Sequence, residues 1–379
     1  MRQSLPADGV AGPRTWAALR PWLVGYRRIR IVQGASFWRL ARRYGISVES
    51  IAAANPELDP TDLPAGGEIV GPLAFEVVPT DISFTYEVLS LCIEGIAARY
   101  PDVRTGSFGH SVLGRELPRL TLGYGPHRVF YNAAHHANEW ITTPLLMRFA
   151  ERYAEAAVFD RNIGGRRARE QMAAVTLVIA PMVDPDGVDL VCGAFSPGSP
   201  EWLRAAMLST PGIPFPSGWK ANIEGVDLNL QYPALWERAR EIKFAQGYTK
   251  PGPRDYVGPE PLAAPEARAV YELSVAEDFD RTLSWHTQGE VIYWQFSDFR
   301  PAGAEKLGLR LSEVSGYPLE PTPEGSAYAG YKDWFIQEYD RPGYTVEAGR
   351  GISPLPIRDF EEIWERNLGI MTEGISFSE

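Results

Sequence analysis

Along most of the chain, short apolar runs with strand character alternate with longer segments in which apolar residues recur at helical spacing. The strand-like runs occupy residues 119–122, 129–132, 175–179, 281–285 and 344–346. Helical spacing is clearest over residues 145–157 and 265–275. Strands that alternate with helices are typical of an α/β sheet with helices on both faces. We therefore predict a large α/β domain over residues 74–379, built on a mixed, mostly parallel, twisted sheet.

Two stretches of this region are rich in proline and glycine and lack periodic apolar residues. They cover residues 196–218 and 249–264. We interpret both as long surface loops, which in α/β folds often form the walls of a substrate cleft.

A smaller unit precedes this region, over residues 28–73. Strand, helix, helix and strand patterns follow one another at residues 29–32, 37–44, 48–55 and 68–70. Ser36 stands at the N-cap position of the first of these helices. The pattern predicts a compact βααβ unit.

The segment over residues 1–27 carries a turn signal and a short apolar pattern. Asp8-Gly9 favours a turn, and Thr15 is predicted to cap a short helix whose apolar residues are Trp16 and Leu19. A segment this short would expose its apolar residues, so we expect it to pack on its neighbour or to be a remnant.

Composition and charge narrow the class of protein. With 379 residues, 45% of them hydrophobic, the chain is long enough for one large core and a small appendage. The net charge of −11 argues against nucleic acid and anionic membrane surfaces as partners. No stretch approaches the roughly 20 apolar residues of a membrane span. Cys92 and Cys192 are predicted to be inert thiols, since neither lies near a histidine or the other cysteine.

The most informative polar residues follow two of the predicted strands. His136 and Glu139 stand at i and i+3 directly after the apolar run 128–132, and open α/β sheets place their ligands at such strand ends. His135 competes with His136, because His135 and Glu139 are also close at i and i+4; spacing leaves both open. His286, one of only five histidines, ends a second strand-like run in a similar setting.

A further carboxylate follows a third strand, where Glu347 ends the stretch Thr345-Val346-Glu347. Three metal ligands, together with a carboxylate that does not bind the metal, are the minimum set for hydrolysis by a zinc-bound water. The sequence therefore predicts a zinc site and hydrolytic chemistry.

Around all of these residues the chain resembles the zinc carboxypeptidase (metallocarboxypeptidase) family. The matching pieces occur in the family's order and span most of residues 80–379. They are H-x-x-E-W at 136–140, an N-P-D-G-like turn at 184–187, G-V-D-x-N at 225–229, S-x-H ending at His286 and T-x-E ending at Glu347. The resemblance implies one Zn²⁺ and a zinc carboxypeptidase-like sheet.

By this resemblance, the three zinc ligands are His136, Glu139 and His286. The ambiguity with His135 is thereby decided. Asp227 is the expected partner of the other ring nitrogen of His136, where a carboxylate fixes the tautomer and raises ligand basicity.

The resemblance also implies the remaining roles in the site. Glu347 matches the general base, which takes a proton from the zinc-bound water and delivers it to the leaving amine. Lys220 is the basic residue nearest to the position where the family has an arginine for the tetrahedral intermediate. Tyr328 is the expected match to the mobile tyrosine that closes over substrate, with Tyr331 as the alternative.

One position departs from true carboxypeptidases. In the family, G-V-D-x-N is followed by an arginine, which clamps the terminal carboxylate of the substrate together with the asparagine. Here Asn229 is followed by Leu230, and leucine cannot form a bidentate fork to a carboxylate. Asn229 remains a predicted substrate-binding residue, but ordinary C-terminal trimming of proteins is in doubt.

The residues around this departure, at 219–222 and 231–233, are similar to a narrower branch, the γ-D-glutamyl-L-diamino acid peptidases of bacteria. These enzymes cut peptidoglycan stem peptides between D-glutamate and the diamino acid, and they often carry LysM modules. Lys332 stands where the family places the residue at the base of its side-chain pocket. A lysine there would suit a side chain that ends in a carboxylate, as in meso-diaminopimelate; a solvent-facing lysine is the alternative.

The N-terminal units agree with this branch. Residues 28–73 resemble the LysM module, which binds N-acetylglucosamine-containing glycans, although Ala35 replaces the aspartate that usually precedes the helix cap. Residues 1–27 resemble the second half of the bacterial three-helix peptidoglycan-binding domain. Stem peptides or muropeptides, and wall glycan, are therefore the expected partners.

Taken together, the resemblances imply a zinc peptidase that hydrolyses the γ-D-glutamyl–meso-diaminopimelate bond. One alternative is a metallocarboxypeptidase of ordinary peptides that recruits another cation, such as Arg350. Another is a non-catalytic peptidoglycan-binding protein with a decayed hydrolase domain. No signal peptide is visible at residues 1–6, so we expect the bacterial cytoplasm or association with the spore or cell wall, and export stays open.

Overall fold

The computed structural model describes residues 12–377, which fall into two compact units. The first unit holds the chain up to Pro79 together with Glu87–Arg104, and the second holds Thr80–Tyr86 and Thr105–Glu379. Helix α4 (Tyr86–Arg99) therefore lies almost wholly in the first unit, although it follows the expected boundary at residue 74. No helix in the described range is long and apolar enough to cross a membrane.

In the first unit, strands β1 and β2 pair antiparallel, and two helices lie between them in the chain. The bounds are β1 (Tyr26–Arg30), α2 (Phe37–Tyr44), α3 (Val48–Ala54) and β2 (Glu68–Pro72). The predicted βααβ order is confirmed. Ser36 caps α2 as expected, because its Oγ accepts the backbone N–H of Arg39 at 3.4 Å. Buried apolar side chains from these elements and the loops between them form the unit's own core, among them Ile29, Phe37, Leu40, Ile51 and Ile69.

Helix α1 (Pro13–Val24) comes before β1, and the prediction of Thr15 as its cap is wrong. The helix begins earlier, after Gly12, with Pro13 in its first turn. Proline suits this position because its fixed φ is helical and its missing N–H would have no partner there. Thr15 thus lies inside the first turn. The predicted turn at Asp8-Gly9 lies outside the described residues.

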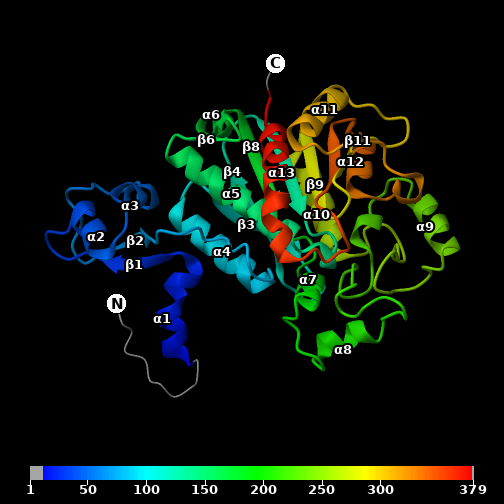
Figure 1. The fold of residues 1–379 in the computed structure, drawn as a ribbon, viewed down its shortest axis with the longest axis horizontal. Coiled ribbons are helices and arrows are strands. Elements are labelled where there is room, and N and C mark those ends of the chain that lie inside the picture. The colour runs from blue at the N-terminus through cyan, green and yellow to red at the C-terminus, as the bar shows by residue number, and fades with distance from the viewer. Residues whose placement is uncertain (1–11, 378–379) are drawn as a thin grey trace. The chain divides into compact units, whose positions relative to one another are not determined.

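The described part of the second unit is built on an eight-stranded sheet (Figure 1). In sheet order the strands are β11 (Leu319–Glu320), β10 (Val291–Tyr293), β12 (Gly343–Glu347), β9 (Arg281–His286), β5 (His127–Ala133), β8 (Val175–Ala180), β4 (Glu116–Leu122) and β3 (Arg104–His110). The consecutive strands β12, β9, β5 and β8 are parallel, whereas β10 and β4 pair antiparallel with β12 and β8. The predicted mixed, mostly parallel sheet is confirmed, and each of the five predicted strands lies within an observed one.

Helices cover both faces of this sheet. Successive side chains of its central strands point to opposite sides, so each face presents side chains against which helices pack. Tyr131 of β5 points to one face, where its hydroxyl donates to the carbonyl of Met371 at 2.7 Å. Its neighbour Phe130 points to the other face, where its ring lies 4.8 Å from that of Phe279. On the first face lie α5 (Thr142–Val158) and α13 (Phe360–Gly374), and on the second α10 (Pro265–Glu277) and α12 (Tyr331–Tyr339) (Figure 1).

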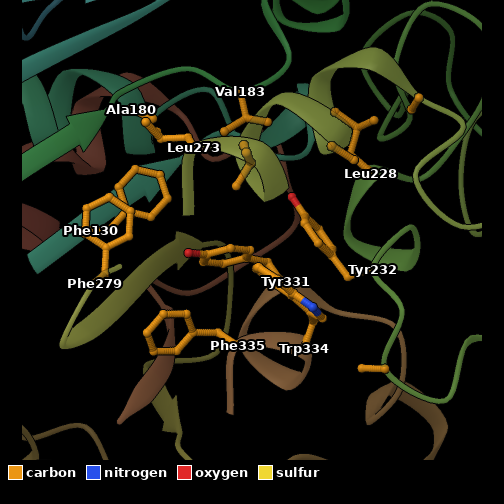
Figure 2. Close-up of a cluster of buried hydrophobic side chains, with 14 of the residues drawn as sticks. Phe130, Ala180, Val183, Leu228, Tyr232, Leu273, Phe279, Tyr331, Trp334 and Phe335 are labelled. Carbon is orange, nitrogen blue, oxygen red and sulfur yellow. The ribbon is translucent and has the colours of Figure 1, made fainter. Parts of the chain in front are cut away.

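Buried aliphatic and aromatic side chains pack on the second face of the sheet (Figure 2). The rings among them, which we call the aromatic cluster, include Phe130, Tyr232, Phe279, Tyr331, Trp334 and Phe335. Figure 2 shows Tyr331 of α12 between the stacked rings of Phe130 and Phe279 and the ring of Tyr232. The Tyr331 and Tyr232 rings lie 5.2 Å apart. Because such rings bury a large apolar area, they fix α12 and the chain next to η2 (Leu228–Leu230) against the sheet.

The two predicted loop regions have different outcomes. Residues 249–264 contain neither helix nor strand, as predicted. Residues 196–218 include α8 (Pro200–Ala206), so the prediction of an unbroken loop is wrong there; Ser199 caps this helix and Pro200 lies in its first turn. The remaining bounds are η1 (Ala137–Glu139), β6 (Asn162–Ile163), β7 (Arg166–Arg167), α6 (Ala168–Ala174), α7 (Pro185–Val191), α9 (Trp236–Ala245), α11 (Ala304–Ser315), η3 (Glu324–Ser326) and η4 (Ile357–Asp359).

Replacing Gly125 by alanine is expected to destabilise the protein by about 3 kcal/mol. A Cβ at this position would lie 1.9 Å from the carbonyl carbon of Ala174 and 2.1 Å from the nitrogen of Val175, in the peptide bond that joins α6 to β8. Gly325→Ala is the control, since nothing lies within 4 Å of its Cβ. Chemical unfolding followed by tryptophan fluorescence measures both variants. If Gly125→Ala and Gly325→Ala were equally stable, the close approach of Gly125 to the Ala174–Val175 backbone would be contradicted.

Candidate active site

The predicted site residues stand at the carboxyl ends of three neighbouring parallel strands. His286 is the last residue of β9 and Glu347 the last residue of β12, and the two are register partners. His136 follows β5, on the other side of β9, and opens the short helix η1 that ends with Glu139. Because parallel strands end at one edge of a sheet, four residues from three distant parts of the sequence meet there.

The side chains of His136, Glu139 and His286 converge on one point, and their ligand atoms all lie within 4.8 Å of one another. The Nδ1 atoms of the two histidines are 3.1 Å apart, and each lies 2.9 Å from a different oxygen of the Glu139 carboxylate. Ligand atoms around a tetrahedral zinc ion, with bonds of about 2.0–2.1 Å, lie roughly 3.3 Å apart. Two imidazoles and one carboxylate are a ligand set of catalytic zinc sites, which keep a fourth position open. The three residues therefore fit a metal ion.

The competing histidine, His135, points away from this triad. Its Nε2 lies 2.9 Å from the hydroxyl of Tyr232, within the aromatic cluster. Burial and the nearby histidines lower the pKa of His135 well below its ordinary value. His135 is thus a neutral histidine of the protein interior, and the structure brings His136 to the site in its place.

Asp227 links the triad to its surroundings. Its Oδ1 lies 3.1 Å from Nε2 of His136 and also accepts the backbone N–H of Asn229, while its Oδ2 accepts from Nζ of Lys220 at 3.0 Å and from the backbone N–H of Asp255 at 3.3 Å. Burial would raise the pKa of Asp227, but Lys220 and His136 hold it well below its ordinary value. Because Nε2 of His136 contacts the ionised Asp227, its Nδ1 is the nitrogen that faces Glu139 and His286.

The charges of the triad follow from the same contacts. Burial alone would lower the pKa of His136, but Glu139 and Asp227 raise it to about 9. Burial would raise the pKa of Glu139, yet the two histidines hold it below its ordinary value. His286 has no such carboxylate on its second nitrogen; its Nε2 has no hydrogen-bond partner among the described residues, and burial lowers its pKa. A neutral imidazole is the form that binds a metal ion.

Lys220 lies beside the triad through both its backbone and its side chain. Its carbonyl accepts the N–H of Ala137 at 3.1 Å, which pins the turn that carries His136 and Glu139. Burial would lower the pKa of Lys220, but the carboxylates of Asp227, Asp255 and Glu139 raise it overall. The ammonium group is therefore a fixed positive charge next to the candidate metal position.

Glu347 faces the same cleft without belonging to the triad. Burial and the charge of Glu139 raise its pKa to about 8. A carboxyl group that is poised near neutrality, beside a metal site and free of an ion-pair partner in the described part of the chain, has the properties of a general base.

The cleft in front of these residues has a volume of about 500 Å³. Sequence reasoning placed His136, Glu139, Lys220, Asp227, Asn229, His286, Lys332 and Glu347 in the site, and all eight line this cleft. It missed other lining residues, among them Asn138, Lys243, Arg254, Asp255 and Tyr293. The Pro/Gly-rich region 249–264 was predicted to wall the cleft and supplies two of these, whereas no described lining residue comes from 196–218.

Three of the remaining predicted residues have side chains that are already engaged. Tyr328 does not line the cleft, and its ring lies 6.5 Å from that of Phe296. Tyr331 is buried in the aromatic cluster. Arg350 is paired with Glu290 at 2.6 Å and is 79% exposed.

Two polar side chains on the α12 side of the cleft have defined partners. Asn229 accepts the backbone N–H of Tyr331 at 3.0 Å through its Oδ1. Lys332 is only 4% exposed, which excludes the solvent-facing alternative. Its Nζ donates to the carbonyl of Gln295 at 2.7 Å and pairs with Asp333.

Comparison with known proteins agrees with this geometry. The family model described as zinc carboxypeptidase matches residues 90–368, and the LysM domain model matches residues 29–72. Gamma-D-glutamyl-L-diamino acid endopeptidase 1 of Lysinibacillus sphaericus is 41% identical over 304 residues, which is 80% of this chain and 75% of that protein. The uncharacterized protein YqgT of Bacillus subtilis is 37% identical over 290 residues, or 76% of each chain.

Solved structures with far lower identity share the fold. Bovine thrombin-activatable fibrinolysis inhibitor superposes with a TM-score of 0.58 at 18% identity, over 77% of this chain and 95% of its own. Carboxypeptidase A of Helicoverpa armigera superposes with a TM-score of 0.57 at 17% identity, over 90% of this chain and 87% of its own. The metal triad, the fold and the extent of the family match lead to one conclusion: this chain belongs to the zinc carboxypeptidase family and carries a LysM domain before its peptidase domain.

Proposed function

We propose that this protein is a zinc-dependent peptidase that hydrolyses the γ-D-glutamyl–meso-diaminopimelate bond of bacterial cell-wall stem peptides. The observation that carries the proposal is the combination, in one cleft, of an intact metal triad with Leu230 at the position of the family's carboxylate clamp. The first feature supports hydrolysis, and the second argues against recognition of an ordinary C-terminus. The 41% identical relative, which is named for the γ-D-glutamyl-L-diamino acid bond, supports the same choice.

The chain's own residues supply the acid–base chemistry and the electrostatics. One zinc ion, held by His136, Glu139 and His286, would supply a Lewis acid and lower the pKa of a water in the cleft toward about 7. Glu347 is positioned to accept a proton from that water and to return it to the leaving amine. A cation in the triad favours the ionised, proton-accepting form of Glu347, against the burial that raises its pKa.

Lys220 and Asp227 prepare the site before substrate arrives. The ammonium group of Lys220 is held by the Asp227 carboxylate and can stabilise negative charge on the substrate oxygen without moving. Asp227 keeps the Nε2–H of His136 engaged, which leaves Nδ1 as the ligand atom.

The other parts of the molecule fit a wall substrate. The LysM domain supports binding to wall glycan, and we propose that this module holds the protein on N-acetylglucosamine-containing strands. Lys332 uses two of its three donor positions on Gln295 and Asp333, and its side chain lines the cleft. We propose that the third donor binds the terminal carboxylate of the diaminopimelate side chain. By contrast, the cation considered for an ordinary carboxypeptidase, Arg350, is paired with Glu290 and does not line the cleft.

Zinc-loaded protein incubated with L-Ala-γ-D-Glu-meso-diaminopimelate is expected to release L-Ala-D-Glu and free diaminopimelate. Glu347→Gln should keep its zinc but lower kcat by about 10²- to 10⁴-fold, because general-base assistance is lost. The exposed Glu324→Gln is the matched control. Mass spectrometry of the products, with and without a chelator, is the measurement. Preferential cleavage of a peptide with C-terminal phenylalanine or aspartate, or no cleavage of the stem peptide, would refute the proposal.

Asp227→Asn should weaken zinc binding by about 10- to 100-fold. The amide can still accept from Nε2 of His136, but it lacks the charge that raises the basicity of this ligand and balances Lys220. Competition with a chromogenic chelator measures the affinity, and the exposed Asp340→Asn serves as the control. An unchanged zinc affinity in a folded Asp227→Asn protein would argue against the assigned role.

Lys332→Met should abolish most of the preference for diaminopimelate over lysine at the third stem position. In the native protein this preference is expected to be about tenfold or more in kcat/KM, because a charge-assisted hydrogen bond to the terminal carboxylate is available only with diaminopimelate. The exposed Lys306→Met is the control. If the variant keeps the full preference, the carboxylate is bound elsewhere.

A further inference from the structure

Arg254 is a cation of the cleft that the proposed mechanism does not use. Its backbone is fixed on both sides by residues next to the metal triad. On one side, the carbonyl of Pro253 accepts the N–H of Lys220 at 2.8 Å and the N–H of Ala221 at 3.0 Å. On the other side, the N–H of Asp255 donates to Oδ2 of Asp227 at 3.3 Å. The backbone on both sides of Arg254 is thus fixed relative to Lys220 and Asp227, which lie next to the triad.

The guanidinium group of Arg254 is only partly engaged. Its Nε donates to Oδ2 of Asp255 at 2.6 Å, and in the described part of the chain the two terminal nitrogens have no hydrogen-bond partner. The side chain is 45% exposed and lines the cleft. This geometry leaves the end of the planar fork, the part that binds carboxylates in a bidentate manner, available to a ligand.

The charges on this wall of the cleft favour an anion. Asp255 is also paired with Lys243 at 2.7 Å, and Asp227 is paired with Lys220. Three cations, Lys220, Lys243 and Arg254, thus surround two carboxylates, Asp227 and Asp255. One positive charge remains unmatched among these five groups, and Arg254 is the most exposed of the three cations, at 45% against 20% for Lys220 and 12% for Lys243.

The substrate of the proposed function carries an anion close to its scissile bond. When D-glutamate is linked through its γ-carboxyl, its α-carboxylate stays free. That group is four bonds from the scissile carbonyl carbon, at most about 5 Å away. A peptide whose acyl residue is not acidic has no carboxylate at this place, and neither does one with D-isoglutamine. A cation beside the triad can therefore distinguish a D-glutamyl residue with a free carboxylate from these residues.

We propose that Arg254 binds the free α-carboxylate of the D-glutamyl residue through its terminal guanidinium nitrogens and thereby selects substrates with a free carboxylate on the acyl side of the scissile bond. The assignment rests on the proposed function, and it places the specificity-determining charge on the side of the scissile bond opposite to the diamino acid.

The test compares two stem peptides, L-Ala-γ-D-Glu-meso-diaminopimelate and its analogue with D-isoglutamine, in which a neutral carboxamide replaces the α-carboxylate. Wild-type protein is expected to prefer the carboxylate peptide by about 10- to 100-fold in kcat/KM. Arg254→Gln should lose this preference by slowing the carboxylate peptide alone, and Arg254→Lys should be intermediate. Arg268→Gln is the matched control, because its Nε is likewise bonded, to the carbonyl of Leu262, and its side chain lies outside the cleft lining.

The outcomes separate the two claims. If the wild type cleaves both peptides equally, or if Arg254→Gln keeps the full preference with an unchanged zinc content, the role of Arg254 is refuted while the proposed function stands. If neither peptide is cleaved by zinc-loaded wild type, the proposed function fails, and the Arg254 assignment fails with it. An equal loss on both peptides in Arg254→Gln would mean that this residue only supports the loop, which also refutes the proposal.

Discussion

The buried carboxylate of Asp227 is the contact on which the organisation of the site depends. A carboxylate without exposure is stable in a protein only when its oxygens are fully bonded, since its desolvation is costly. Here the four partners come from four places: the turn after β5, Lys220, η2 and the 249–264 loop. Removing any one partner would leave an oxygen of this buried anion with a missing hydrogen bond. The requirement to satisfy one anion therefore draws together a metal ligand, a cation and the loop that carries Arg254.

The sheet supplies the second constraint. Parallel strands β5, β9 and β12 end at the same edge, so residues 136, 286 and 347 meet there. The aromatic cluster on the second face holds α12 and the chain next to η2 in place beneath them. Apolar packing fixes the positions of the strands and loops. The charged side chains can then adopt only the few arrangements in which each has its hydrogen-bond and ion-pair partners. The metal-binding geometry follows from both.

The parts of this arrangement that could be predicted from sequence are those with local signals. Apolar runs identified the five central strands, and H-x-x-E after one of them identified the triad's first half. Spacing could not choose between His135 and His136, because the choice depends on Tyr232. This residue lies 97 residues from His135 in the sequence, and its hydroxyl is 2.9 Å from the Nε2 of His135. Thr15 failed as a cap because Pro13 starts the helix earlier. Lys243 lies in no recognisable motif, because its position in the cleft depends on a tertiary contact with Asp255.

Net charge describes this protein poorly at the place where it acts. The chain carries a formal charge of −11, and its cleft is lined by five carboxylates as well as by four cations: Glu139, Asp227, Asp255, Asp333 and Glu347, with Lys220, Lys243, Arg254 and Lys332. The acidic residues Asp227, Asp255 and Asp333 hold these cations in place at distances set by hydrogen bonds, so their positive ends are fixed before substrate binds. Fixed charges of this kind require no reorganisation when an anionic peptide enters, which makes them more effective than mobile surface lysines. A stem peptide that carries several carboxylates therefore meets cations at fixed positions in the cleft, even though the net charge of the molecule repels it at long range. The match is local, and at physiological salt the Debye length of about 8 Å confines the repulsion to the outer surface.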